Sequence, residues 1–180
     1  MKKLIAAIMV SFMMLSLMTG CGAEKSFDGD ILDVVSFDMS KTEILKNAEK
    51  EFGEISSMET NGKTVLNYPE DAEIIVYSLD SVYGYEGDIV FSFESDLCTL
   101  RKVEILYLVE DGNIVKQYKD IVNQFIDMYG PGIWDTEEMY YMTYKGKTRI
   151  ALNYFNDSSI IKIFFGAEEN WDDYFDAMNS

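Results

Sequence analysis

Few residues in this chain have the types and spacing that catalysis needs. The 180 residues include no histidine and only two cysteines, Cys21 and Cys98. Without histidine, Ser-His-Asp and Cys-His arrangements and histidine-based zinc sites are excluded. The sequence EDGN at 110–113 lacks the alternating oxygen ligands of a calcium loop, and no glycine-rich phosphate loop occurs. We therefore predict no catalytic residues, no metal site and no cofactor.

Cys21 lies where a long apolar stretch gives way to charged residues. Lys2 and Lys3 precede a run from 4 to 18 that is apolar apart from two serines. A positive start, a short apolar core and a small-residue exit are the three parts of a secretory signal peptide. We predict that residues 1–20 are such a signal; an uncleaved membrane span, which usually needs about 20 apolar residues, is the alternative.

The four residues Met18-Thr19-Gly20-Cys21 resemble the lipobox of bacterial lipoproteins. In that class, the resemblance implies, the cysteine thiol receives a diacylglyceryl group and the leader is cut before it. Two or more acyl chains hold a protein stably on a membrane, whereas one holds it only marginally. Cys21 is therefore expected to be a lipid attachment site, on the extracytoplasmic side of the cell membrane. An ordinary cleaved signal with an incidental cysteine stays open.

The charge of the exported part limits its partners. Removal of residues 1–20 takes away two lysines and no acids, so 13 basic residues face 32 acidic ones and the net charge is 13 − 32 = −19. So acidic a protein is repelled by phosphate backbones, and we predict no nucleic-acid partner. With Cys21 acylated, Cys98 has no disulfide partner and is expected to be a small buried hydrophobe.

The exported residues are predicted to form one domain. The composition, 48% hydrophobic and 14% aromatic, is that of a folded chain. Residues 21–30 are small and polar, and are predicted to be a lipid-attached tether. The domain is predicted over 31–166, followed by an acidic C-terminal helix or tail over 167–180.

Two helices are predicted. The first begins at Ser40, which forms a capping box with Glu43, and it ends at Gly53. The second runs from about 113 to 129, where apolar residues keep the helical period, and Pro131 stops it.

Elsewhere the apolar period falls to two, which predicts strands with one covered face. The predicted strands include residues 89–93, 103–107, 150–154 and 161–165, with shorter candidates at 64–68, 73–79 and 138–144. Hairpin turns are predicted at Asn61-Gly62, Tyr83-Gly84, Glu86-Gly87 and Lys145-Gly146.

The order of these elements is helix, strands, helix, strands. It predicts an α+β fold in which two tandem helix-plus-antiparallel-sheet repeats, over about 31–110 and 111–166, form one globular domain. The matching stretches are MSKTEILKNAEKEFG with GDIVFSF, and VNQFIDMYGPGIW with RIALNYF. This arrangement resembles the β-lactamase-inhibitor-protein-like superfamily, which includes small outer-membrane assembly lipoproteins. The resemblance implies binding of other proteins across an exposed sheet face, and it carries over no functional residue.

Four aromatic residues are candidates for a binding surface. Tyr83 and Tyr85 flank a glycine turn, where their rings would stack on a sugar or peptide or else pack on the sheet. Trp134 is a further candidate. Trp171 lies in the acidic segment, which either docks on the domain as an amphipathic helix or is exposed to engage a basic partner or cations.

These features predict a lipid-anchored, non-enzymatic envelope protein that binds another envelope protein. The first alternative is an extracytoplasmic module that binds a sugar, a peptide or a divalent cation. The second is a hydrolase that uses two carboxylates across a cleft.

Overall fold

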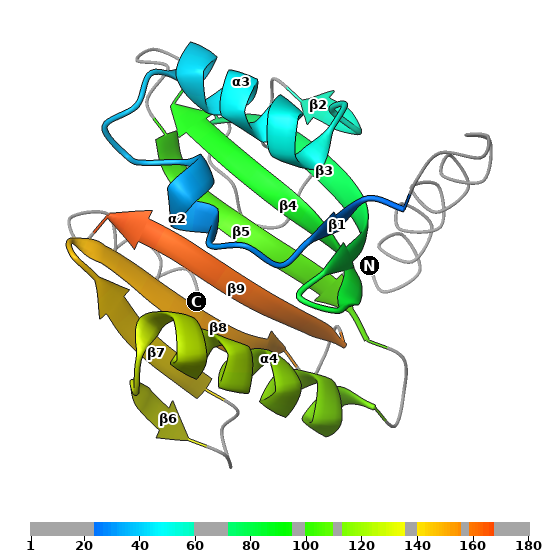
Figure 1. The fold of residues 1–180 in the computed structure, drawn as a ribbon, viewed down its shortest axis with the longest axis vertical. Helices are drawn as coiled ribbons and strands as arrows, with labels where there is room; N and C mark the ends of the chain where they lie inside the picture. The colour runs from blue at the N-terminus through cyan, green and yellow to red at the C-terminus, as the bar shows by residue number, and fades with distance from the viewer. Residues whose placement is uncertain are drawn as a thin grey trace.

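The computed structural model describes residues 24–59, 72–94, 100–109, 113–135, 140–155 and 159–167. In these ranges the chain forms one nine-stranded sheet and three helices (Figure 1). The helices are α2 (Ile31–Val34), α3 (Lys41–Phe52) and α4 (Ile114–Tyr129). The strands are β1 (Ser26–Phe27), β2 (Ser57–Glu59), β3 (Ala72–Val82), β4 (Tyr85–Glu94), β5 (Leu100–Leu108), β6 (Ile133–Asp135), β7 (Tyr140–Lys145), β8 (Thr148–Phe155) and β9 (Ile160–Ala167).

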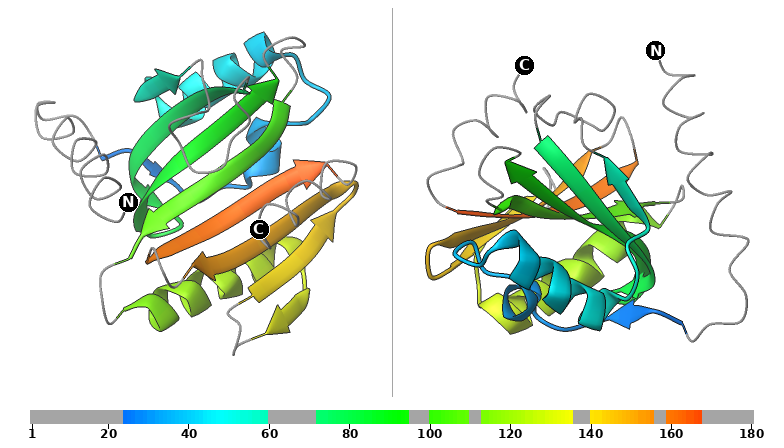
Figure 2. Two further views of the ribbon diagram at one scale, coloured as in Figure 1. Left: turned by 180° about the vertical axis from the view of Figure 1, so that it is seen from behind. Right: turned by 90° about the horizontal axis from the view of Figure 1, so that it is seen from above.

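The predicted fold class, α+β with two tandem helix-plus-antiparallel-sheet repeats, is wrong. The strand order is β1-β3-β4-β5-β9-β8-β7-β6, with β2 also paired to β3, and the chain is mostly one curled sheet (Figure 2). β5 and β9 join the two groups of strands, from Lys102 opposite Gly166 to Leu108 opposite Ile160. Apolar alternation shows that a strand exists but not which edge it pairs with. Pairing these two edges satisfies N–H and C=O groups that separate sheets would leave open.

Both predicted helices are confirmed, and α3 has its predicted caps. The Ser40 hydroxyl accepts from the Glu43 N–H at 3.4 Å, and the Glu43 carboxylate accepts from the Ser40 N–H at 3.0 Å. Gly53 ends α3 with φ of 82° and Gly130 ends α4 with φ of 85°, a region that glycine enters without a Cβ clash. These two helices are therefore specified by local sequence.

The strand predictions succeed in part. β4, β5, β8 and β9 contain the four main predicted strands, whereas β1, β2, β6 and α2 were not predicted. The turn at Tyr83-Gly84 is confirmed, with φ of 51° and 88°. The turn predicted at Glu86-Gly87 is wrong, because Gly87 lies inside β4, where a Cβ would come within 2.9 Å of the Tyr107 ring. The candidates at 61–62 and 64–68 lie outside the described residues.

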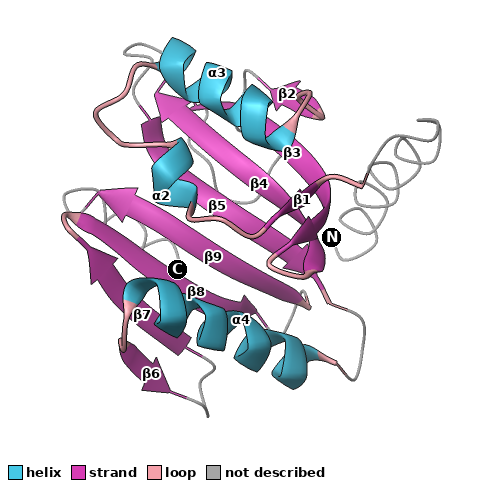
Figure 3. Ribbon diagram, in the orientation of Figure 1, coloured by secondary structure: helices cyan, strands magenta, loops and turns pink. Residues whose placement is uncertain are grey.

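All three described helices cover one face of the sheet, which we call the inner face (Figure 3). Its core is rich in aromatic rings that meet edge-on or tilted. Phe52 of α3 lies 5.5 Å from Tyr77, and Phe125 of α4 lies 6.1 Å from Phe165, between ring centroids. Since β5 and β9 pair, the two helices share one continuous core.

The second half of the segment predicted as a tether lies in the fold. β1 pairs with β3 in parallel, and the Phe27 side chain is buried against Phe52, 5.0 Å away. Asp30 caps α2 by accepting from the Leu32 N–H at 2.9 Å, and also binds Lys145. The described chain thus enters its sheet at Ser26. No helix among the described residues is long and apolar enough to cross a membrane.

Candidate functional site

Charged side chains occupy the middle of the other face of the sheet, which we call the outer face. The strand registers arrange them in three neighbouring rows, because partners in register project to the same side. The rows are Ser92–Lys102–Gly166–Arg149, Val90–Glu104–Phe164–Ala151 and Asp88–Leu106–Lys162–Asn153. We call the members of these rows on β5, β9 and β8 the outer patch.

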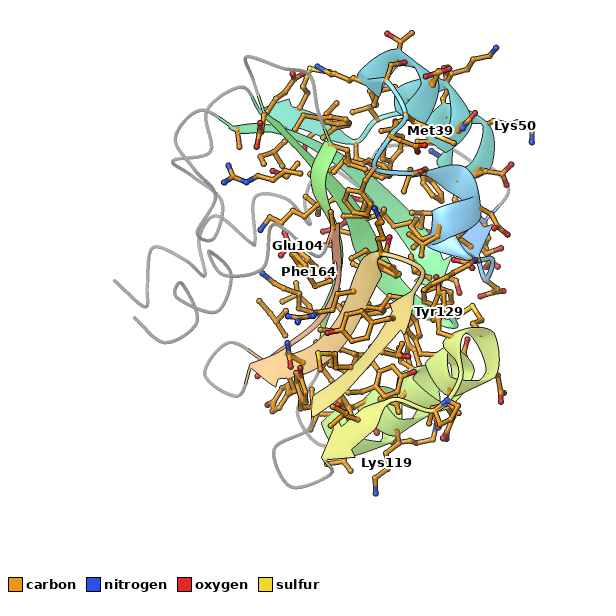
Figure 4. The ribbon with its side chains drawn as sticks, turned by 90° about the vertical axis from the view of Figure 1, so that its left-hand side faces the viewer. Met39, Lys50, Glu104, Lys119, Tyr129 and Phe164 are labelled. Atoms are coloured by element: carbon orange, nitrogen blue, oxygen red, sulfur yellow. The ribbon has the colours of Figure 1, made fainter. Side chains whose placement is uncertain are left out.

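Glu104 is the centre of the outer patch and is fully buried. Its Oε1 lies 3.0 Å from Nζ of Lys162 and its Oε2 lies 3.3 Å from Nζ of Lys102. The two lysine side chains are only 13% and 14% exposed. Figure 4 shows Glu104 and Phe164 on one side of the sheet and Tyr129 and Met39 on the other.

The two lysines are held close to one carboxylate and to each other. Burial lowers the pKa of Lys102, the Glu104 charge opposes that shift, and the Lys162 charge adds to it. The Lys102 ammonium also lies 5.9 Å from the centroid of the Phe164 ring, within the range of a cation–π contact. Lys102, Glu104 and Lys162 therefore place two ammonium groups beside one carboxylate in a site with little water.

Arg149 extends the positive charge toward the edge of the sheet. Its Nε donates to the Tyr144 hydroxyl at 2.9 Å, and its guanidinium lies 5.4 Å from the Tyr144 ring centroid. Tyr144 pairs with Arg149 in register and is 44% exposed. This tyrosine forms an accessible aromatic rim beside the patch.

The charge of the outer patch is opposite to that of the chain. Lys102, Arg149 and Lys162 supply +3 and Glu104 supplies −1, so the three central strands carry +2 on this face. The whole chain carries −17. A positive patch on an acidic protein attracts an acidic partner and repels a basic one.

The predicted site residues lie elsewhere. Tyr83 is buried in the inner core and donates to the Gly29 carbonyl at 3.0 Å, so its ring does not face a partner. Tyr85 is half-buried on the helix side and donates to Asp120 at 2.8 Å. Trp134 lies in β6, but its side chain, like Cys21 and Trp171, falls outside the described residues. Tyr83 thus lies in the inner core, and Tyr85 packs against that core and binds Asp120 of α4.

A second polar cluster lies on the inner face, where Asp30 meets α4 and β7. The Tyr129 hydroxyl donates to Asp30 at 2.5 Å, and Lys145 binds Asp30 and lies 3.8 Å from Asp33. Burial raises the pKa of Tyr129, so that hydroxyl stays a hydrogen-bond donor rather than a base. Both carboxylates face a lysine, an arrangement that joins α2 to the β7–β8 hairpin. Among the described residues, no group of three acidic, cysteine or histidine side chains is placed to hold a metal ion.

The outer patch was not predicted from the sequence. Glu104 and Lys162 stand at the polar positions of two alternating strands, a pattern that is typical of solvent-facing residues. Only the pairing of β5 with β9 brings the acid and the two lysines together. The sequence offered only the charge itself as a signal, since four of the 15 basic residues, Arg101, Lys102, Arg149 and Lys162, lie on these three strands.

No known protein family, no curated protein and no solved structure matches this chain. Function is therefore inferred from the outer patch together with the sequence.

Proposed function

We propose that this protein is a lipid-anchored, non-enzymatic protein of the extracytoplasmic side of the cell membrane, and that its outer patch binds an acidic segment of another envelope protein. The observation that carries the proposal is the group of three cations and one aromatic ring on a single sheet face of a strongly acidic chain.

The chemistry of the patch favours protein over small-molecule binding. Lys102 and Lys162 share the Glu104 carboxylate, and Arg149 on the third strand extends their charge toward the edge of the sheet. Phe164 supplies an apolar side chain between them, which is buried in this structure, and Tyr144 supplies an accessible ring at the rim. Apolar contact with a charged surround is how protein interfaces combine affinity with orientation.

The anchor is supported by the sequence at Cys21 and by the position of β1. Four residues separate Cys21 from Ser26, the first residue of the sheet. Fully extended, they span about 14 Å. A lipid on Cys21 would therefore hold the domain directly at the membrane surface, where a neighbouring membrane protein is within reach.

Cross-linking from two exposed positions tests the binding face. A photoreactive phenylalanine analogue replaces either Tyr144, at the rim of the outer patch, or Val115, which is 50% exposed on α4. After illumination of intact cells, we expect an adduct with a second protein from position 144 and not from position 115. Arg149→Gln should reduce the adduct several-fold, because it removes one of the patch cations.

Lys119→Gln is the matched control, since it removes one positive charge from an exposed position on α4 (Figure 4). It should leave the adduct unchanged. Equal adducts from positions 144 and 115, or equal losses in the two charge variants, would contradict the binding face.

Fractionation tests the anchor separately. The unaltered protein should sediment with membranes and carry a lipid mass on Cys21, whereas Cys21→Ser should not be lipidated. An unmodified sulfur on Cys21 in the native protein would contradict the lipid anchor. The binding role of the outer patch would still be tested by the cross-links alone.

A further inference from the structure

The outer patch is buried, although the described helices all lie on the opposite face. Glu104 and Ala151 are fully buried and Phe164 is 2% exposed, as is Val90 in the same row on β4. Side chains in the middle of a sheet face lose their water only when another layer of atoms lies over them. The identity of that layer decides when the patch is open to a partner.

We propose that the acidic C-terminal segment, residues 168–180, docks on the outer patch and occupies it until a partner displaces it. This inference rests on the proposed function, because it names the resting occupant of the same surface. Release of the segment would then regulate binding.

The C-terminal segment begins beside the outer patch, because β9 ends there. Gly166 lies in register between Lys102 and Arg149, and Ala167 is the last residue of the strand. Trp171 follows four residues later, a reach of about 13 Å in extended chain. Phe164 lies three residues back along β9, about 10 Å from Ala167. A reversal of the chain after Ala167 would direct the segment back along β9, toward the apolar row of the patch.

The charges of segment and patch are complementary. Residues 168–180 contain five acids and no lysine or arginine, and so carry −5. The acids are Glu168, Glu169, Asp172, Asp173 and Asp176. The patch carries +2 from Lys102, Arg149 and Lys162 against Glu104. Attraction of this kind is strong where water is excluded and weakens with salt at the exposed rim.

Residues 60–71 are another candidate for the cover. They contain one lysine, one glutamate and one aspartate, a charge of −1, and they include no tryptophan. Their charge complements the patch less well than that of 168–180, and the fluorescence of Trp171 separates the two.

Tryptophan fluorescence tests the inference in the lipidated full chain in detergent. The chain has two tryptophans, so Trp134→Phe leaves Trp171 as the only one. We expect blue-shifted emission and several-fold weaker acrylamide quenching than for free N-acetyltryptophanamide. Arg149→Gln should increase the quenching at least twofold, and Lys119→Gln should not change it.

A second variant keeps the test valid if Arg149→Gln misfolds. Neutralising the five acids to glutamine or asparagine changes only residues beyond β9. It should also increase the quenching of Trp171 at least twofold. Quenching of Trp171 as strong as that of the free compound would overturn the inference, as would quenching that responds to neither variant.

The cross-link from position 144 separates this inference from the proposed function. With the neutral segment, the adduct should rise several-fold because the competitor is lost. If Trp171 is accessible while the adduct still depends on Arg149, the resting cover is wrong and the function stands. If Trp171 is docked but no adduct forms with either the native or the neutral C-terminal segment, the proposed function is wrong and the docking of residues 168–180 stands.

Discussion

The positive character of the outer patch depends on one carboxylate that two ammonium groups share. Glu104 lies within 3.3 Å of both Lys102 and Lys162 and has no exposed surface. Burial of charge is costly unless opposite charges and hydrogen bonds compensate it. The glutamate therefore stabilises a pair of lysines that would otherwise repel each other.

Replacing that carboxylate should cost more than removing one of its cations. Glu104→Gln keeps the size of the side chain but removes the carboxylate that both buried ammoniums approach, and we expect a loss of about 3–5 kcal/mol in the free energy of unfolding. Lys102→Met leaves Glu104 beside Lys162 and should cost less. Urea unfolding of both variants measures the order, and an equal or smaller loss for Glu104→Gln would contradict this account.

Asp88 gives a pH-dependent prediction at the edge of the same face. Burial raises its pKa above the usual 3.8, and a hydrogen bond from Ser78 opposes the shift. The unfolded chain therefore loses this proton at a lower pH than the folded chain. Between the two pKa values stability falls as pH rises, and above both the full penalty is present.

Asp88→Asn should therefore raise stability at pH 7, because it removes the buried charge and still accepts from Ser78. Below the usual pKa of 3.8, where Asp88 is protonated in both states, the gain should vanish. Urea midpoints at several pH values check this, with exposed Asp127→Asn as the control. A gain that persists at low pH would show that the charge is not its cause.

At the scale of elements, the two-residue strand β1 ties the N-terminal end of the described chain to the core. Its Phe27 ring lies 5.0 Å from Phe52 and 6.0 Å from Tyr83. The Tyr83 N–H also donates to the Phe27 carbonyl at 2.9 Å. A short strand thus makes both a side-chain and a backbone connection.

Phe27→Ala should lower the free energy of unfolding by about 3 kcal/mol, because it leaves a cavity between two aromatic rings. Exposed Ser26→Ala, one residue away, should change it by less than about 0.5 kcal/mol. Thermal or urea unfolding measures both. Similar small effects would mean that β1 is not part of the folded core.

The elements also show what could be read from the sequence. Ser40, Glu43 and Gly53 predicted α3 because caps act within a few residues along the chain. β1 and β6 were missed, since strands of two and three residues are too short to show a period of two. The outer patch was missed for another reason: Lys162 meets Glu104 only through a pairing 58 positions apart, which no local pattern specifies.

At the scale of the whole molecule, the sheet separates the aromatic core on its inner face from the charged outer patch on its outer face. The inner face holds the three described helices and the aromatic core, whereas the part of the outer face on β5, β9 and β8 carries the opposite charge to the chain. The predicted repeats would have divided the chain into two similar halves. Instead, pairing of β5 with β9 creates the surface on which Glu104, Lys102 and Lys162 meet.

The most direct test of the central claim is a titration in which a labelled peptide with the sequence of residues 168–180 is added to the protein carrying the neutral segment. Fluorescence anisotropy should show saturable binding that weakens about fivefold or more with Arg149→Gln, a loss of about 1 kcal/mol. Lys119→Gln should bind as well as the parent. Absence of saturable binding, or equal weakening by the two charge variants, would show that the outer patch does not bind acidic segments.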